Sequence, residues 1–231
     1  MVISTNLILE KIEKYLDALS SNSNEHSWRY CHDAFHPRSG KDADYLALQL
    51  TVYLASWGMY RGSSGLAKTN YTVHRGAAEL ILGFRNEIYL NNNRALLNAS
   101  QIEQVIQLKG QLSAYYKSIK VNWPNEGLKA ISPTDTLISK IILGSLGCVP
   151  AFDTYFLAGI KQYQIDPTFS SNSITQINAF IQENEPLFLA LQAKHQEYTL
   201  IKLADMFFFQ CGYDLLSKQD TTSPPSSPAL R

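Results

Sequence analysis

The chain has 231 residues and a balanced charge, with 20 lysine and arginine side chains against 20 aspartate and glutamate side chains. A domain of this length buries about 70% of its unfolded surface, so it needs neither disulfides nor a metal to fold. Dedicated nucleic-acid-binding domains usually carry net positive charge. The balance therefore takes away the simplest argument for a nucleic-acid partner, although a local basic patch is compatible with it.

Cysteine use and hydropathy indicate the compartment. Cys31, Cys148 and Cys211 lie far apart and form no CxxC pair, which is typical of reduced thiols in a core rather than of disulfides or a zinc site. The N-terminal stretch has no basic leader, and no apolar run reaches the roughly 18 residues that a membrane span needs. The sequence therefore predicts a cytoplasmic protein with no secretory signal and no membrane partner.

Apolar residues recur every three or four positions along most of the chain, which is the period of helices packed on a common core. The segments with this period are 7–19, 42–57, 73–89, 100–119, 132–147, 153–163, a stretch starting at 173, another starting at 186, and 199–217. No segment predicts a strand, and composition does not shift between segments. The sequence predicts an all-α fold, in which residues 1–217 form a single compact globular domain of about eight or nine helices.

Three segments carry further structural predictions. Residues 42–57 are apolar on nearly every side, and a helix without a polar face is usually buried, so we expect it to be the central helix. Residues 121–129 contain Trp123-Pro124 and Gly127, which predict a loop. Residues 218–231 are rich in proline and serine and lack apolar anchors, which predicts a disordered tail.

Several helix starts carry capping residues. Ser100 and Glu103 match the capping-box pattern, in which the two side chains bond each other's backbone N–H groups. Ser132 followed by Pro133 predicts an N-cap with proline at the first helical position. Ser173 is the predicted cap of a later helix.

Residues 26–36, HSWRYCHDAFH, hold three of the five histidines. His32 and His36 stand four apart, a spacing similar to the HExxH zinc helix, in which both histidines share one face. A third ligand would have to come from His26, Cys31 or a distant carboxylate. However, Pro37 biases His36 away from helical geometry. The ordinary interpretation is a helix end whose histidines are solvated or hydrogen-bonded, and we assign no metal to it.

The same segment carries a resemblance to a nuclease family. Arg29 and His36 are separated by six residues, which resembles the R-x4-6-H spacing of HEPN-type ribonucleases, a helical family. In that family the pair lies on a late helix, and a polar residue follows the arginine. Here the pair lies early in the chain and Tyr30 follows the arginine, so the implied RNA cleavage rests on spacing alone.

Residues 56–65, SWGMYRGSSG, form a glycine- and serine-rich loop after an apolar helix. Such a loop can leave backbone N–H groups unpaired, and with the Arg61 guanidinium it favours an anion such as phosphate or carboxylate. The ordinary alternative is a helix end at which Arg61 meets the helix dipole. Residues 53–64 and 146–156 also resemble segments of a group of compact bacterial proteins, a likeness that implies no function.

Residues 147–160, GCVPAFDTYFLAGI, contain a helix end at Gly147, then Pro150, then Asp153 at the start of the next helix. This order is similar to the catalytic-aspartate region of helix-hairpin-helix DNA glycosylases, which are all-helical. The resemblance implies that Asp153 assists the departure of a base. It lacks the glycine-rich hairpin of that family, whose place is taken by SPTDTLISK. A simple N-cap role also explains Asp153.

Our preferred interpretation is a cytoplasmic helical protein that binds a protein or a small-molecule partner, because the sequence contains no complete catalytic set. The first alternative is a nucleic-acid-processing enzyme or binder of the helix-hairpin-helix-glycosylase or HEPN type. The second is a metal-dependent hydrolase that uses His32 and His36. The catalytic candidates are Asp153, Arg61 and His26, without a cofactor, and we expect at least two of these three to share one cavity.

Overall fold

The computed structural model describes residues 4–18, 26–61, 64–88, 95–123 and 127–222. The elements in these ranges are, in chain order, α1 (Thr5–Asp17), α2 (His26–Ala34), α3 (Ala43–Ser56), α4 (Arg75–Ile88), α5 (Ala99–Ser118), β1 (Lys120–Trp123), β2 (Gly127–Ala130), α6 (Asp135–Leu146), α7 (Thr154–Lys161), α8 (Ser171–Glu183), α9 (Glu185–Lys194) and α10 (Leu200–Thr222). Short 3-10 helices cover Pro37–Ser39, Leu66–Lys68 and Tyr71–His74. The predicted helical class and single compact domain are confirmed, with ten α-helices in the described ranges rather than eight or nine.

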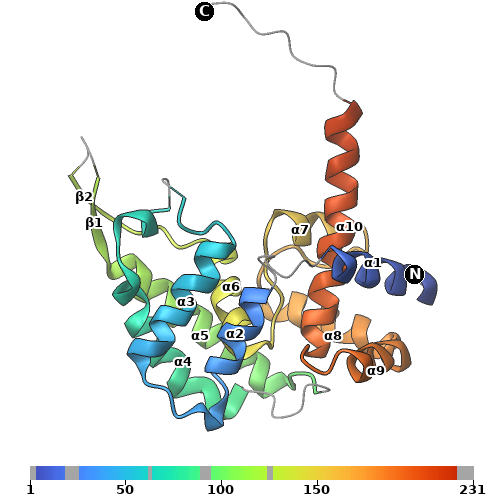
Figure 1. Ribbon diagram of the computed structural model, residues 1–231, viewed down its shortest axis with the longest axis horizontal. Helices are drawn as coiled ribbons and strands as arrows, with labels where there is room; N and C mark the ends of the chain where they lie inside the picture. Colours follow the sequence, from blue (N-terminus) through green and yellow to red (C-terminus); the bar gives the residue numbers. More distant parts are fainter. Residues whose placement is uncertain (1–3, 19–25, 62–63, 89–94, 124–126, 223–231) are drawn as a thin grey trace, which may run out of the picture.

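The central helix is α6. It lies between a group formed by α2 to α5 and a group formed by α1 and α7 to α10 (Figure 1), and every residue from Leu137 to Leu146 is buried. The sequence placed the central helix at residues 42–57, and that assignment was wrong. The corresponding α3 leaves Tyr45, Leu48 and Val52 exposed on one side. An apolar helix is therefore not always an interior one, because burial depends on which elements pack around it.

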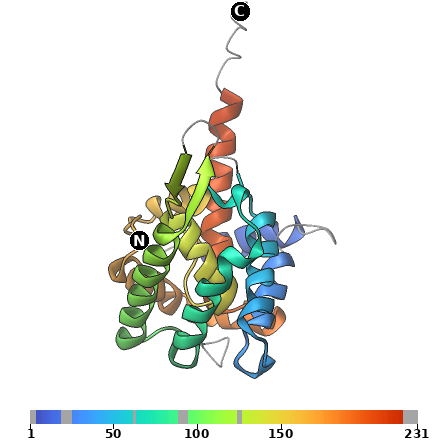
Figure 2. The same cartoon turned by 90° about the vertical axis from the view of Figure 1, so that its left-hand side faces the viewer.

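A short hairpin replaces the loop predicted over residues 121–129. Strands β1 and β2 pair antiparallel, with Lys120 opposite Ala130 and Trp123 opposite Gly127. Val121 is the one buried residue of the pair, and it packs near Gly65 in the loop after α3. Both views show the hairpin projecting from the same end of the molecule as the C-terminal turns of α10 (Figures 1 and 2).

Helix caps lie two or three residues from their predicted positions. The observed N-caps are Asn98 for α5, Thr134 for α6 and Ser170 for α8, where the sequence predicted Ser100, Ser132 and Ser173. Polar residues of capping type stand at both positions in each case, so local chemistry alone did not decide between them. Asp153 is the N-cap of α7, as predicted: its Oδ1 atom accepts a hydrogen bond from the Phe156 N–H at 3.1 Å.

Helix α10 ties the two ends of the described chain together. It crosses α7 so closely that the backbone of Gly159 touches that of Phe208. Its Asp214 carboxylate accepts hydrogen bonds from Lys11 at 2.9 Å and Lys14 at 2.8 Å, both on α1. Helix α10 also runs on to Thr222, past the predicted domain end at 217, while residues 223–231 of the predicted tail lie outside the described residues. None of the described helices is both long and apolar enough to cross a membrane.

His74 is a fully buried imidazole held between two tyrosines. Its Nε2 atom lies 2.7 Å from Tyr60 Oη and its Nδ1 atom lies 2.5 Å from Tyr116 Oη. Burial lowers the pKa of His74 to about 3, and burial also lowers the pKa of His32 to about 4. Both imidazoles are therefore neutral in the folded protein across the physiological pH range.

We expect the free energy of unfolding to fall as the pH drops from 7 to 4. Below about pH 6.5, the ordinary pKa of histidine, His74 is protonated in the unfolded chain but remains neutral in the folded protein. Acid therefore favours the unfolded state. For His74 alone the loss by pH 4 is about 3 kcal/mol, since one pKa unit corresponds to about 1.4 kcal/mol. Urea unfolding curves at pH 7, 5.5 and 4 measure it.

The control for this prediction is His74→Gln, which keeps a polar side chain but cannot titrate. Carboxylates and His32 contribute equally to both proteins, so the difference between the two pH profiles isolates His74. Wild type should lose more stability than the variant between pH 6.5 and 4. Parallel profiles would contradict a neutral, buried His74.

Candidate functional site

A pocket of about 620 Å³ opens where the C-terminal end of α3 meets the starts of α6 and α7. The loop after α3 supplies Trp57 and Arg61, the N-cap and first turn of α7 supply Asp153 and Tyr155, and α10 supplies Phe209. These segments are distant in sequence, so the pocket exists only once α6 has brought them together. Its size is in the range of pockets that bind small organic molecules.

The floor of the pocket is a buried ion pair. Lys140 Nζ on α6 lies 2.8 Å from Asp153 Oδ2, and only 5% of the lysine side chain and 14% of the aspartate side chain are exposed. The ammonium also lies 4.6 Å from the centroid of the Trp57 ring. A buried charge is tolerated when it is paired and hydrogen-bonded, and here each partner satisfies the other.

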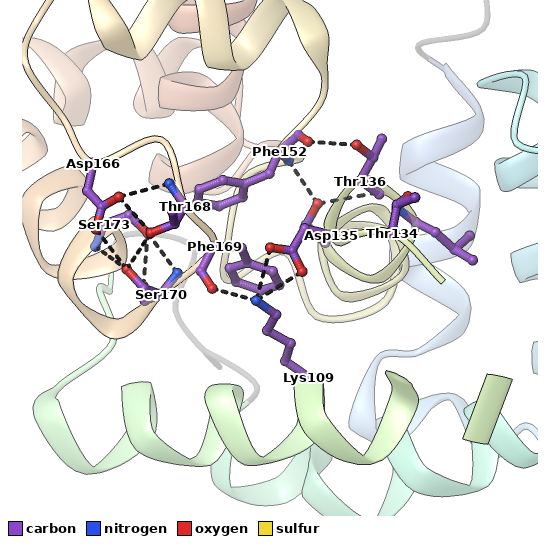
Figure 3. A network of polar contacts seen from close by, with 12 residues as sticks. Lys109, Thr134, Asp135, Thr136, Phe152, Asp166, Thr168, Phe169, Ser170 and Ser173 are labelled. Carbon is purple, nitrogen blue, oxygen red and sulfur yellow. Dashed lines mark hydrogen bonds and ion pairs between the residues drawn. The ribbon is translucent and has the colours of Figure 1, made fainter. Parts of the chain in front are cut away.

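Backbone contacts hold the two halves of this ion pair in place. Thr136 Oγ1 on α6 donates to the Phe152 carbonyl at 2.9 Å, and Ser139 Oγ accepts from the Phe152 N–H at 2.8 Å. These bonds fix the residue before Asp153 against the helix that carries Lys140. The Thr136 contact is visible in Figure 3.

The start of α6 is anchored from outside the pocket by Lys109 of α5 (Figure 3). Its ammonium lies 3.0 Å from Asp135 Oδ1, donates to the Phe169 carbonyl at 2.6 Å, and sits 4.7 Å from the centroid of the Phe169 ring. The Phe169 ring in turn stacks on Phe152, with the centroids 4.8 Å apart. The network joins α5, α6 and the loop before α8, and so supports the pocket wall at Thr134.

The neighbouring Asp166 organises the turn that leads into α8 (Figure 3). Its carboxylate accepts hydrogen bonds from the Thr168 hydroxyl and N–H, and also from Asn172 and Ser170. These bonds, those from Thr168 first, lower the pKa of Asp166 to about 2. These hydrogen bonds show that Asp166 has a structural role in forming the turn.

A second buried ion pair lies behind the first. Lys202 Nζ is 2.7 Å from Asp205 Oδ2 on α10, with 3% and 7% of the two side chains exposed, and Asp205 Oδ1 accepts from the Ala151 N–H at 2.9 Å. Both ion pairs and Trp57 line a cavity of about 10 Å³, roughly one water molecule in size. The Trp57 indole N–H is buried and bonds to no described residue.

Aromatic rings form the outer wall of the pocket. Phe209 packs edge-to-face on Tyr155 and on Trp57, at centroid distances of 5.1 and 6.2 Å. It also stacks along α10 with Tyr213, at 6.5 Å. Tyr155 and Tyr213 are 36% and 45% exposed, so part of this apolar surface faces solvent.

Arg61 stands at the pocket mouth. Gly58, with a φ of +67°, turns the chain after α3, and the Arg61 guanidinium folds back against the Gly58 Cα. The side chain is exposed, and within the described ranges it forms no ion pair or hydrogen bond. It therefore has donors to offer to a ligand.

Two of the three predicted catalytic residues, Arg61 and Asp153, line this one pocket. The third, His26, begins α2 and is not part of the pocket lining. Sequence reasoning missed Lys140 and Trp57. A single lysine inside the apolar helix ISKIILGS was the available signal for Lys140, because such a charge needs a buried partner.

The histidine segment adopts a different arrangement from the zinc helix. Helix α2 ends at Ala34, so His32 and His36 do not share one helix. The His32 ring is buried against Trp28 and lies 3.3 Å from the Ser145 carbonyl, whereas His36 Nδ1 accepts from the Arg38 N–H and caps the next turn. Within the part of the chain that the structure describes, no three potential ligand side chains are grouped around a metal position.

The Arg29 and His36 pair is also divided by the end of α2. Arg29 Nε lies 3.7 Å from Asp33 Oδ2, and both side chains are mostly exposed. His36 points into its capping contact.

Comparison with known proteins adds no further indication, because no family model, curated protein or solved structure matches this chain.

Proposed function

We propose that this protein binds a small organic ligand in the pocket between α3, α6 and α7. One observation carries the proposal: an exposed arginine without an acidic partner, a buried ion pair and three aromatic rings line the same cavity of about 620 Å³. Small-molecule sites combine apolar contact area with converging polar groups, and this lining supplies both, with nine of its sixteen described residues polar or charged.

The residues that line the pocket would have different roles in ligand binding. Trp57, Tyr155 and Phe209 offer apolar contact area, and aromatic rings supply much of the binding energy of such sites. Lys140 and Asp153 neutralise each other, so the floor presents polar atoms of both kinds without net charge. Arg61 adds a fixed positive charge at the mouth.

The proposal includes a reducing, cytoplasmic setting. Cys31, Cys148 and Cys211 are free thiols, and all three are buried. Burial raises the pKa of the Cys148 thiol to about 12, which keeps it protonated and unreactive at neutral pH. None of the three thiols is among the residues that line the pocket.

A fragment screen by saturation-transfer NMR tests the function. Ser132→Trp places a large ring at the exposed edge of the pocket, and we expect it to weaken the binding of pocket-directed fragments by about tenfold or more, equivalent to about 1.4 kcal/mol. A ligand present at a hundred times its dissociation constant should also raise the free energy of unfolding by about 2.7 kcal/mol.

The matched control is Ser171→Trp, because Ser171 is an exposed serine at the start of α8, outside the pocket lining. It should bind fragments as wild type does. Fragments that bind all three proteins equally would place binding elsewhere and contradict the proposal. An oligonucleotide that binds with a steep salt dependence, in the absence of fragment binding, would instead favour the nucleic-acid alternative.

A further inference from the structure

We infer that the ligand of this pocket is a flat-ringed organic anion, carrying one carboxylate or phosphate group that Arg61 binds. The inference rests on the proposed function and narrows it to one chemical class. It is carried by the charge of the lining, by the side chains whose donors have no partner, and by the arrangement of the rings.

The charge of the lining calls for an anion. The charged residues that line the pocket are Arg61, Lys140 and Asp153, and two of these three form a 2.8 Å ion pair. One positive charge, that of Arg61, is left without a partner. A ligand with a negative group satisfies it, whereas a cationic ligand would have to compete with Lys140 for Asp153.

The unpartnered side chains of the lining include several hydrogen-bond donors. Within the described ranges, the side chains of Arg61, Ser132, Thr154 and Tyr155 line the pocket and form no hydrogen bond. The hydroxyls of Ser56, Ser64 and Thr136 are engaged, because each donates to a backbone carbonyl. Thr134 Oγ1 instead accepts a hydrogen bond from the Leu137 N–H, so its own proton remains available. A guanidinium flanked by free hydroxyls matches the several acceptor oxygens of a carboxylate or phosphate.

The rings favour a flat partner. The Lys140 ammonium already covers one face of the Trp57 ring. Phe209 packs edge-to-face with both Trp57 and Tyr155. Tyr155 therefore contributes a partly exposed ring beside an aromatic edge, a geometry in which a further planar ring can stack or pack edge-to-face. An aliphatic chain would use the same area with less directional contact.

Isothermal titration with four ligands that share one ring tests the inference. The probes are 2-naphthoate, 2-naphthyl phosphate, 2-naphthamide and 2-naphthylmethylammonium. We expect at least one anion to bind about tenfold more tightly than the neutral amide, because an anion makes charge-assisted hydrogen bonds to Arg61. The ammonium should bind more weakly than the amide. Whichever anion binds more tightly identifies the head group.

Arg61→Gln should reduce the preference for the anion over the neutral amide to about twofold or less. The matched control is Arg38→Gln, which removes the same charge from an exposed arginine outside the pocket lining and should retain the preference. Equal affinity for anion and amide, with Ser132→Trp weakening both, would overturn the inference and leave the proposed function standing. If Ser132→Trp weakened the binding of none of the probes, both the inference and the proposed function would be overturned.

Discussion

Replacing Gly159 by alanine is expected to lower the free energy of unfolding by about 3 kcal/mol or more. A Cβ atom at this position would lie 1.9 Å from the Phe208 carbonyl oxygen on α10, and at Gly212 it would lie 1.8 Å from the Tyr155 carbonyl oxygen on α7. Backbone atoms cannot rotate away as a side chain can, so the two helices would have to separate. Urea unfolding of Gly159→Ala and Gly212→Ala measures the cost.

Two other helical glycines provide matched controls. A Cβ atom at Gly83 in α4 or at Gly110 in α5 meets nothing within 4 Å. Alanine there should raise the free energy of unfolding by about 0.5–1 kcal/mol, because glycine loses more backbone entropy on folding. If Gly159→Ala were as well tolerated as Gly110→Ala, the close crossing of α7 and α10 would be wrong.

Removing the ammonium of Lys202 is the second change with a large expected effect. Lys202→Met leaves the Asp205 carboxylate 7% exposed and without its cation, and breaking a buried ion pair in this way costs about 3–5 kcal/mol. Most of that cost is the unpaired charge rather than the lost attraction.

The double variant Lys202→Met/Asp205→Asn separates these two contributions. The asparagine oxygen can still accept the hydrogen bond from the Ala151 N–H, but the stranded charge is gone. We expect the double variant to be more stable than Lys202→Met alone. Arg75→Met serves as the surface comparison, because Arg75 and Glu79 are mostly exposed and 3.8 Å apart, and its effect should stay within about 0.5 kcal/mol. Equal losses at both sites would contradict a buried ion pair.

The sequence predicted the helices well and their places in the domain less well. A period of three to four residues reports that a segment has an apolar side, and this located most helices. It does not report which helix is surrounded. Residues 42–57 looked more apolar than α6, whose Lys140 suggests a solvent-facing side, yet Lys140 is buried because Asp153 neutralises it.

The residues of the candidate site also divide into those that the sequence predicted and those that it did not. Asp153 and Arg61 stood out because a turn and a helix start are local features, readable from neighbouring residues. Lys140 and Trp57 acquire their roles from partners far along the chain, which no local pattern encodes. The hairpin at β1 and β2 was missed for a related reason: its strands are four residues long, and only Val121 is buried.

The contact of α1 with α10 has a consequence for biosynthesis. Tyr15 packs edge-to-face on Phe209, and Lys11 pairs with Asp214, so the earliest described helix docks on the latest. The two partners are about two hundred residues apart in sequence, so α1 leaves the ribosome long before α10 is synthesised. During that time the apolar side of α1 is not buried against its native partner. Nascent chains stalled before α10 should therefore recruit holdase chaperones more strongly than released, full-length ones.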